Sequence, residues 1–149
     1  MAFELTSTAF SQGQTIPKQF TADGRDTPPP LKWTEPPAGT RSFALICEDP
    51  DAPRGTFTHW VAFNLPGEQR ELSEGGTLSG GAALGTNDFG KVGYGGPSPP
   101  PGKPHRYFFK LYALDNALDL PAGSKREDLL AAMNGHILGE TELMGTYGR

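Results

Sequence analysis

The residues best suited to chemistry lie in two proline-rich segments, each of which runs into a histidine. The first, DPDAPRGTFTHW, carries Asp49 and Asp51 in a turn and His59 ten residues after Asp49. Carboxylates commonly orient an imidazole by accepting its N–H, so Asp49 and His59 are candidates for one wall of a site. Pro50 and Pro53 restrict the residues before them and fix the path of the turn. The same turn could be structural, with its aspartates accepting hydrogen bonds from nearby amides.

The second segment, GYGGPSPPPGKPHRY, ends in His105, Arg106 and Tyr107. Gly96 and its neighbouring glycines let the backbone approach a ligand, and the prolines from Pro97 onward limit its flexibility. Fixed N–H groups beside an imidazole are suited to bind an oxyanion. Tyr107 alternates with His105, so its hydroxyl can donate to the same ligand. The segment is not a P-loop, because the Gly-Lys-Ser/Thr end is missing and a strand pattern follows.

Three strand patterns must position these residues, and they cover 42–48, 59–65 and 105–114. The first is a continuous apolar run, which is typical of a buried strand. The second alternates and predicts that His59 shares a face with Val61, opposite Trp60. The third places His105 and Tyr107 on one face. Both histidines therefore begin strands, where a polar group can line the mouth of a pocket.

One helix is predicted in AGSKREDLLAAMNGH, with Ser124 as N-cap and Glu127 completing a capping box. Leu129 and Met133 supply its apolar stripe. No repeat and no domain boundary interrupts the chain. We therefore expect one domain over residues 1–149, mainly β, with one or two short peripheral helices.

The composition excludes several function classes. The 149 residues carry a net charge of −4 and no lysine- or arginine-rich run, which argues against nucleic acid as a partner. The single cysteine, Cys47, cannot form an internal disulfide and lies in an apolar run that predicts burial. Neither a signal peptide nor an apolar run of roughly 18 residues is found. We expect a cytoplasmic protein without a cofactor.

Three kinds of function remain open from the residues alone. The chain could be a non-catalytic module that binds a small anion or a headgroup. It could be an enzyme that uses the histidines, Asp49 and Tyr107 in acid–base chemistry. It could also hold a metal between two histidines and a carboxylate. No activated nucleophile is evident, because Ser98 lies among prolines and no GxSxG motif is present. The locked turn and the glycine-rich loop favour anion binding.

Together, the DPDAP…HW and GYGGPSPPPGKPHRYFFKLYALD segments resemble the two signature regions of the phosphatidylethanolamine-binding protein family. The closer likeness is to the bacterial and archaeal branch of the family, the Raf-kinase-inhibitor-like proteins. The segment GHILGETELMGTYGR also resembles the C-terminus of that branch. The resemblance implies an antiparallel β-sandwich of Greek-key character with a pocket for phosphate, acetate or a phosphoethanolamine headgroup. The pocket residues that it implies are Asp49, His59, Gly96, Pro97, His105 and Tyr107, supported by Pro50, Asp51, Pro53 and Arg106.

The resemblance also implies a cis peptide bond before Pro53, a homodimer, and a regulatory or inhibitory role toward a protein partner that it does not name. Because the sequence ends with GTYGR, we expect it to lack the C-terminal helix of mammalian members. A carboxylate repels an anion unless one of them is protonated. Asp49 is therefore expected to hold His59 or a loop amide in place, while His105, Tyr107 and an amide near Gly96 contact the anion.

Overall fold

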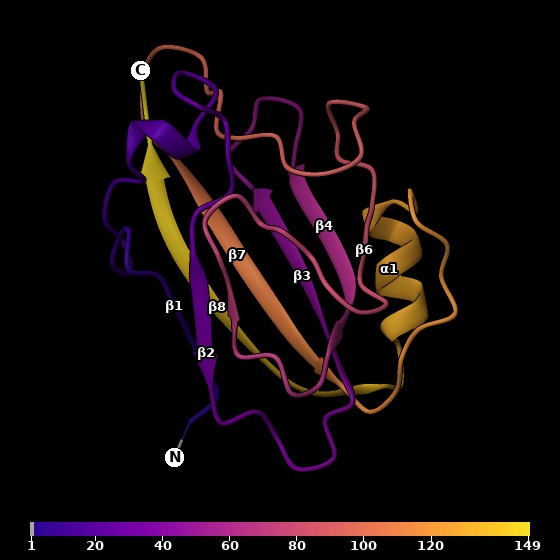
Figure 1. Cartoon of the computed structure of the whole chain (residues 1–149). Helices are drawn as coiled ribbons and strands as arrows, with labels where there is room; N and C mark the ends of the chain where they lie inside the picture. Colours follow the sequence, from indigo (N-terminus) through magenta and orange to yellow (C-terminus); the bar gives the residue numbers. More distant parts are fainter. Residues whose placement is uncertain (1) are drawn as a thin grey trace.

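The computed structural model describes residues 2–149 and arranges its strands in two antiparallel sheets (Figure 1). One sheet has the order β1-β2-β5 and contains β1 (Glu4–Thr6), β2 (Leu31–Thr34) and β5 (Glu71–Leu72). The other has the order β6-β4-β3-β7-β8 and contains β3 (Ser42–Asp49), β4 (Phe57–Pro66), β6 (Ala83–Leu84), β7 (His105–Leu114) and β8 (Ile137–Tyr147). Within this sheet β7 returns to lie beside β3, which gives a Greek-key order.

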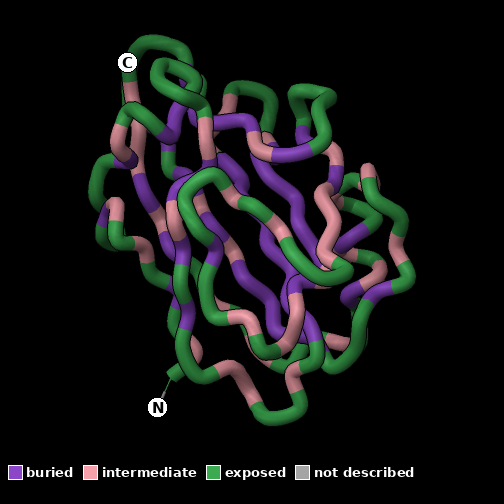
Figure 2. Tube along the Cα trace, viewed as in Figure 1, coloured by how far each residue is buried: buried purple, intermediate pink, exposed green. Residues whose placement is uncertain are grey.

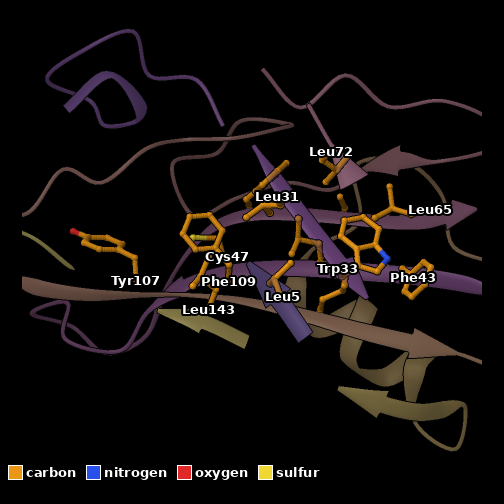
Figure 3. Close-up of a cluster of buried hydrophobic side chains, with 14 of the residues drawn as sticks. Leu5, Leu31, Trp33, Phe43, Cys47, Leu65, Leu72, Tyr107, Phe109 and Leu143 are labelled. Atoms are coloured by element: carbon orange, nitrogen blue, oxygen red, sulfur yellow. The ribbon is translucent and has the colours of Figure 1, made fainter. Parts of the chain in front are cut away.

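The two sheets pack face to face around one hydrophobic cluster (Figure 3). Leu31 and Trp33 of β2 are buried in it, whereas Lys32 and Thr34 between and after them are exposed. The indole of Trp33 meets the ring of Phe43 on β3 with a centroid separation of 5.4 Å. Cys47 is fully buried in the same cluster. The predicted β-sandwich and the predicted burial of Cys47 are confirmed.

A helix covers the other face of the larger sheet. Leu129 and Met133 of α1 (Arg126–Met133) belong to a second cluster with Ile46 and Val61. Since β3 lies between α1 and the smaller sheet, all eight of its residues are buried, and no alternation is visible in its sequence (Figure 2). Among residues 2–149, no helix is long and apolar enough to cross a membrane.

The helix begins one residue later than the sequence predicts. Its N-cap is Lys125, whose backbone N–H donates to the Asp128 carboxylate at 2.9 Å. Ser124 instead donates its hydroxyl to the carbonyl of Pro121 at 2.7 Å, which keeps it outside the helix. Asp128 thus takes the place expected for Glu127. A one-turn 3₁₀ helix, η1 (Lys18–Phe20), is the other helical element described.

The pairing of β3 with β4 contains a bulge near the end of β3. Cys47 pairs with Trp60, but the next residue of β3, Glu48, pairs with Thr58. His59 is therefore an extra residue on β4. A bulge of this kind redirects the side chain that it carries.

The bulge places His59 on the face of the sheet that looks into the sandwich. Its ring lies 5.2 Å from the ring of Tyr107, which belongs to the same cluster as Trp60, whereas Val61 belongs to the cluster beneath α1. The prediction that His59 and Val61 share a face of the sheet is wrong, because regular alternation does not allow for an extra residue. Tyr107 does lie on the face expected for it.

Candidate functional site

The fold brings the two histidine segments to one end of the larger sheet. Because β3 is antiparallel to both β4 and β7, its last residue, Asp49, lies beside the starts of both neighbours. A cavity of about 180 Å³ opens there. Its lining consists of Asp49, Ala52, Pro53, Phe57, His59, Phe89, Ser98, Pro99, Pro100, His105 and Tyr107. The structure thus brings together the predicted Asp49, His59, His105 and Tyr107.

Asp49 orients His105, not His59. Its Oδ2 accepts a hydrogen bond from Nδ1 of His105 at 2.7 Å, and its Oδ1 accepts the backbone N–H of Asp51 at 2.7 Å. Asp49 is only 3% exposed, and both of its carboxylate oxygens are engaged within the protein. The other ring nitrogen, Nε2 of His105, remains available to a ligand.

His59 is held by the backbone of the second loop. Its Nδ1 lies 2.7 Å from the carbonyl oxygen of Gly95, and since a carbonyl can only accept, Nδ1 carries the proton. Burial lowers the pKa of His59 below its ordinary value, although the carbonyl of Gly95 and the charge of Asp49 oppose the shift. The ring is therefore neutral at pH 7, and its Nε2 is an acceptor.

Tyr107 carries a polar group without a partner. Its side chain is fully buried, and its hydroxyl has no hydrogen-bond partner in the part of the chain that the structure describes. Figure 3 shows this residue at one end of the hydrophobic cluster, with the hydroxyl directed away from it. Burial, with the nearby charge of Asp49, raises the pKa of Tyr107, so the hydroxyl keeps its proton and can donate. Leaving such a group unpaired costs about 1–3 kcal/mol, which a bound acceptor would offset.

An apolar wall faces these polar groups. The rings of Phe57 and Phe89 meet with centroids 4.7 Å apart, and Phe57 lies 5.0 Å from the ring of His59. Sequence reasoning missed both phenylalanines, together with Ala52 and the Ser98–Pro100 segment. Phe57 could have been found, because it lies two residues before His59 on a strand. Phe89 comes from a loop without periodicity, so no sequence pattern identifies it.

Asp51 and Arg106 support the site from outside the cavity. Arg106 donates from Nε and from its backbone N–H to Asp51 Oδ2, each at 2.9 Å, and from Nη2 to Oδ1 at 2.9 Å. These bonds join the acidic turn to the start of β7 and lower the pKa of Asp51 to about 2. Asp51 is thus held by Arg106 and does not face the histidines. Within residues 2–149, no three His, Cys, Asp or Glu side chains are placed to share a metal ion.

Gly96 and Pro97 do not line the cavity. The N–H of Gly96 donates to Asp26 Oδ1 at 2.6 Å, so the expectation that this amide faces the anion is not met. A side chain at Gly96 would stand 2.7 Å from the carbonyl oxygen of Phe20, so the glycine is needed for close packing. The carbonyl of Pro97 accepts the N–H of Ala22 at 2.9 Å, which ties the loop to the region after η1.

The peptide bond before Pro53 is trans, as are all others in the described chain, so the predicted cis bond is wrong. The turn closes with the N–H of Gly55 donating to the carbonyl of Ala52 at 3.1 Å. This places Pro53 at the second position of a β-turn, which a trans proline favours. Pro50 is exposed and follows directly after β3.

Comparison with known proteins identifies the family. The family model described as phosphatidylethanolamine-binding protein matches residues 6–148. The chain belongs to the phosphatidylethanolamine-binding protein family. The resemblance inferred from the two signature segments is therefore confirmed, and so is the fold that it implies.

Other members of the family match the chain over almost its whole length. It is 49% identical over 149 residues to the UPF0098 protein of Methanothermobacter thermautotrophicus, a match that covers 97% of this chain and 98% of the relative. It is also 49% identical over 151 residues to the UPF0098 protein of Aquifex aeolicus, covering 98% and 88%. The crystal structure of YbcL from Escherichia coli, described as a member of the mammalian family, has a TM-score of 0.94 at 32% identity and covers 100% of this chain and 99% of YbcL.

Proposed function

We propose that this family member binds a small oxyanion in the cavity, namely phosphate or a phosphate monoester such as a phosphoethanolamine headgroup, and carries out no chemistry on it. The observation that carries the proposal is the hydroxyl of Tyr107, which is buried, unpartnered and accompanied by two histidines in the cavity lining. A buried donor of this kind calls for an acceptor. The protein would serve as a binding or regulatory module, in keeping with its family.

The pair of Asp49 and His105 answers the difficulty that a carboxylate poses for an anion site. With both ring nitrogens protonated, His105 donates from Nδ1 to Asp49 at 2.7 Å and from Nε2 to the ligand. The pair is then neutral overall, and the carboxylate presents no uncompensated charge to the anion. Charge-assisted donation from His105 and donation from Tyr107 together hold one face of the ligand.

His59 selects the protonation state of the ligand. Its neutral Nε2 is an acceptor, so it repels a bare oxyanion but accepts a hydrogen bond from a P–OH group. A phosphate monoanion offers both kinds of oxygen, one to accept and one that donates. Sulfate at neutral pH has no proton to donate. We therefore expect phosphate to bind better than sulfate.

The apolar wall restricts what the ligand can carry. The side chains of Phe57, Phe89 and Pro99 offer contact area, but no hydrogen bonds, to a substituent on the ligand. The cavity lining contains no lysine or arginine. A monoanion carrying a small or apolar substituent suits this balance better than a dianion does.

The test is a titration of ¹⁵N-labelled protein with phosphate, O-phosphoethanolamine and sulfate, followed by NMR at pH 6 and pH 8. We expect saturable shifts at Asp49, His59 and Tyr107 that are lost in His105→Ala. Affinity should fall toward pH 8, because a phosphate monoester loses its last proton near a pKa of about 6. Binding that strengthens with pH, or sulfate that binds as well as phosphate, contradicts the proposal.

The same sample distinguishes the two competing functions. Slow release of inorganic phosphate from O-phosphoethanolamine, followed by ³¹P NMR, would favour an enzyme that uses these side chains as acid and base. Stoichiometric metal in the purified protein, found by elemental analysis, would favour a metal site. Either result would overturn a purely binding role.

A further inference from the structure

One wall of the cavity is formed by a segment whose backbone makes almost no hydrogen bonds. Residues 98–104 have the sequence SPPPGKP, and four of the seven are prolines, which lack an N–H. Ser98, Pro99 and Pro100 of this segment line the cavity. The prolines stiffen the shape of the segment, but they do not attach it to the rest of the protein.

A single residue, Arg149, makes that attachment. Its Nη1 donates to the carbonyl of Pro99 at 3.0 Å, and its Nη2 donates to the hydroxyl of Ser98 at 3.3 Å. Its backbone oxygen accepts the N–H of Gly102 at 3.2 Å. Within residues 2–149, every hydrogen bond that residues 98–104 make is to Arg149.

Arg149 is itself held firmly. Its Nε and Nη2 donate to the two carboxylate oxygens of Asp23 at 3.0 and 2.7 Å, in the bidentate geometry that arginine favours. Tyr147 donates its hydroxyl to the same carboxylate at 2.7 Å. The hydrogen bond from Arg149, followed by that from Tyr147, lowers the pKa of Asp23 to about 2. Figure 1 shows this end of the chain beside η1, at the end of the sheet where β7 starts.

We propose that Arg149 is a positioning residue for the anion cavity. Its guanidinium joins the Ser98–Pro99 wall to Asp23 and thereby sets the affinity and the residence time of the anion. This proposal rests on the proposed function. Without the guanidinium, the wall must be ordered each time a ligand binds, and that ordering reduces affinity. Arg149 does not line the cavity, so it acts through the wall and not on the ligand.

The experiment compares phosphate binding in wild type, Arg149→Gln, Arg149→Lys and Asp23→Asn. We expect Arg149→Gln to raise the phosphate Kd about three- to tenfold, mainly through faster dissociation. Arg149→Lys should rescue only part of the loss, because one ammonium cannot reproduce the fork that spans a carboxylate and two loop acceptors. The control is Arg70→Gln, since among residues 2–149 the Arg70 guanidinium donates only to the carbonyls of its own turn, Gly67 and Gln69.

Backbone dynamics separate positioning from general stability. The heteronuclear NOE of Ser98, Gly102 and Lys103 should fall in free Arg149→Gln, while the NOE of β3 and β7 stays unchanged. Asp23→Asn should reproduce the change in Kd, and the double variant should add little to it, as expected for residues that act as one unit.

An unchanged Kd in Arg149→Gln, while the wild type binds phosphate, overturns the role of Arg149 and leaves the proposed function standing. A wild type that shows no saturable shift overturns the proposed function, and the role of Arg149 falls with it. A lower melting temperature with an unchanged Kd and NOE also counts against positioning, because it shows a structural role alone.

Discussion

Tyr94 and Tyr107 differ in whether the phenolic hydroxyl makes a hydrogen bond. Tyr94 donates its hydroxyl to the carbonyl of Phe20 at 2.6 Å, whereas the hydroxyl of Tyr107 has no partner among the described residues. We expect Tyr107→Phe to leave the free energy of unfolding unchanged or to raise it by up to about 1 kcal/mol, because it removes an unsatisfied buried group. The same change should weaken phosphate binding about tenfold, because it deletes a donor.

Tyr94→Phe is the matched control and should behave in the opposite way. It breaks a made hydrogen bond, so unfolding in urea should show a loss of about 1 kcal/mol while the phosphate Kd stays the same. A large destabilisation in Tyr107→Phe would show that its hydroxyl already has a partner within the protein, and the case for an anion in the cavity would be lost.

His59 makes the stability of the fold depend on pH. Burial lowers its pKa below the 6.5 of an unfolded histidine, so just below pH 6.5 the unfolded chain binds more protons than the folded one. The contribution of His59 is therefore complete above pH 6.5 and is lost as the pH falls through the folded pKa. NMR titration of the ring should give a midpoint below 6.5, and His59→Asn should flatten the pH dependence of urea unfolding between pH 7 and 5. A ring midpoint above 6.5 would reverse the sign.

At the scale of elements, two neighbouring carboxylates at the start of α1 can be compared as helix caps. Asp128 accepts the N–H of Lys125 at 2.9 Å, whereas Glu127, one residue earlier, accepts no such bond from the described part of the chain. We expect Asp128→Ala to lower the free energy of unfolding by about 1 kcal/mol and Glu127→Ala by much less. Urea denaturation of the two variants decides between them. Equal losses would mean that charge near the helix N-terminus matters, and the specific hydrogen bond does not.

The elements could be predicted from the sequence where a local pattern determines them. Alternation correctly placed Tyr107 on the interior face of β7, and the apolar run of β3 predicted a buried strand. The face of His59 could not be predicted, because the bulge depends on how β4 pairs with a strand in another part of the chain. Likewise, the partner of Asp49 is His105, which lies 56 residues away and is brought close only by the order of the sheet.

The polar residues of the candidate site could be predicted from residue types and their spacing in the sequence. The residues that form its walls could not. Phe89 approaches the cavity from an irregular loop, and Arg149 reaches the second loop from the far end of the sequence. The amide of Gly96 was misassigned, because the sequence does not show that Asp26 accepts its N–H. Contacts between distant, aperiodic segments are decided by packing and leave no local signal.

At the scale of the whole molecule, the packing of the two sheets leads us to expect that the sandwich opens as a unit. β3 is the central strand of the larger sheet, with β4 and β7 on its two sides, the smaller sheet over one face and α1 over the other. Exposing any part of its interior face requires the two sheets to separate. Cys47 lies on that face, fully buried, so its thiol reports this separation directly.

We therefore expect Cys47 to react with a thiol reagent such as DTNB only through unfolding. Burial raises the pKa of the thiol in the folded protein, so the reactive thiolate forms only after the side chain becomes exposed. In native buffer the rate should be at least about 10³-fold below that of the protein in guanidinium chloride, as the stability of a small domain implies. The logarithm of the rate should rise with urea along the slope of global unfolding. Ser79→Cys, in an exposed turn, supplies a thiol that should react at once and calibrates the reagent. A rate of Cys47 modification that does not depend on urea would mean that the two sheets separate locally in the folded protein. The end of β3 beside the cavity would then be mobile.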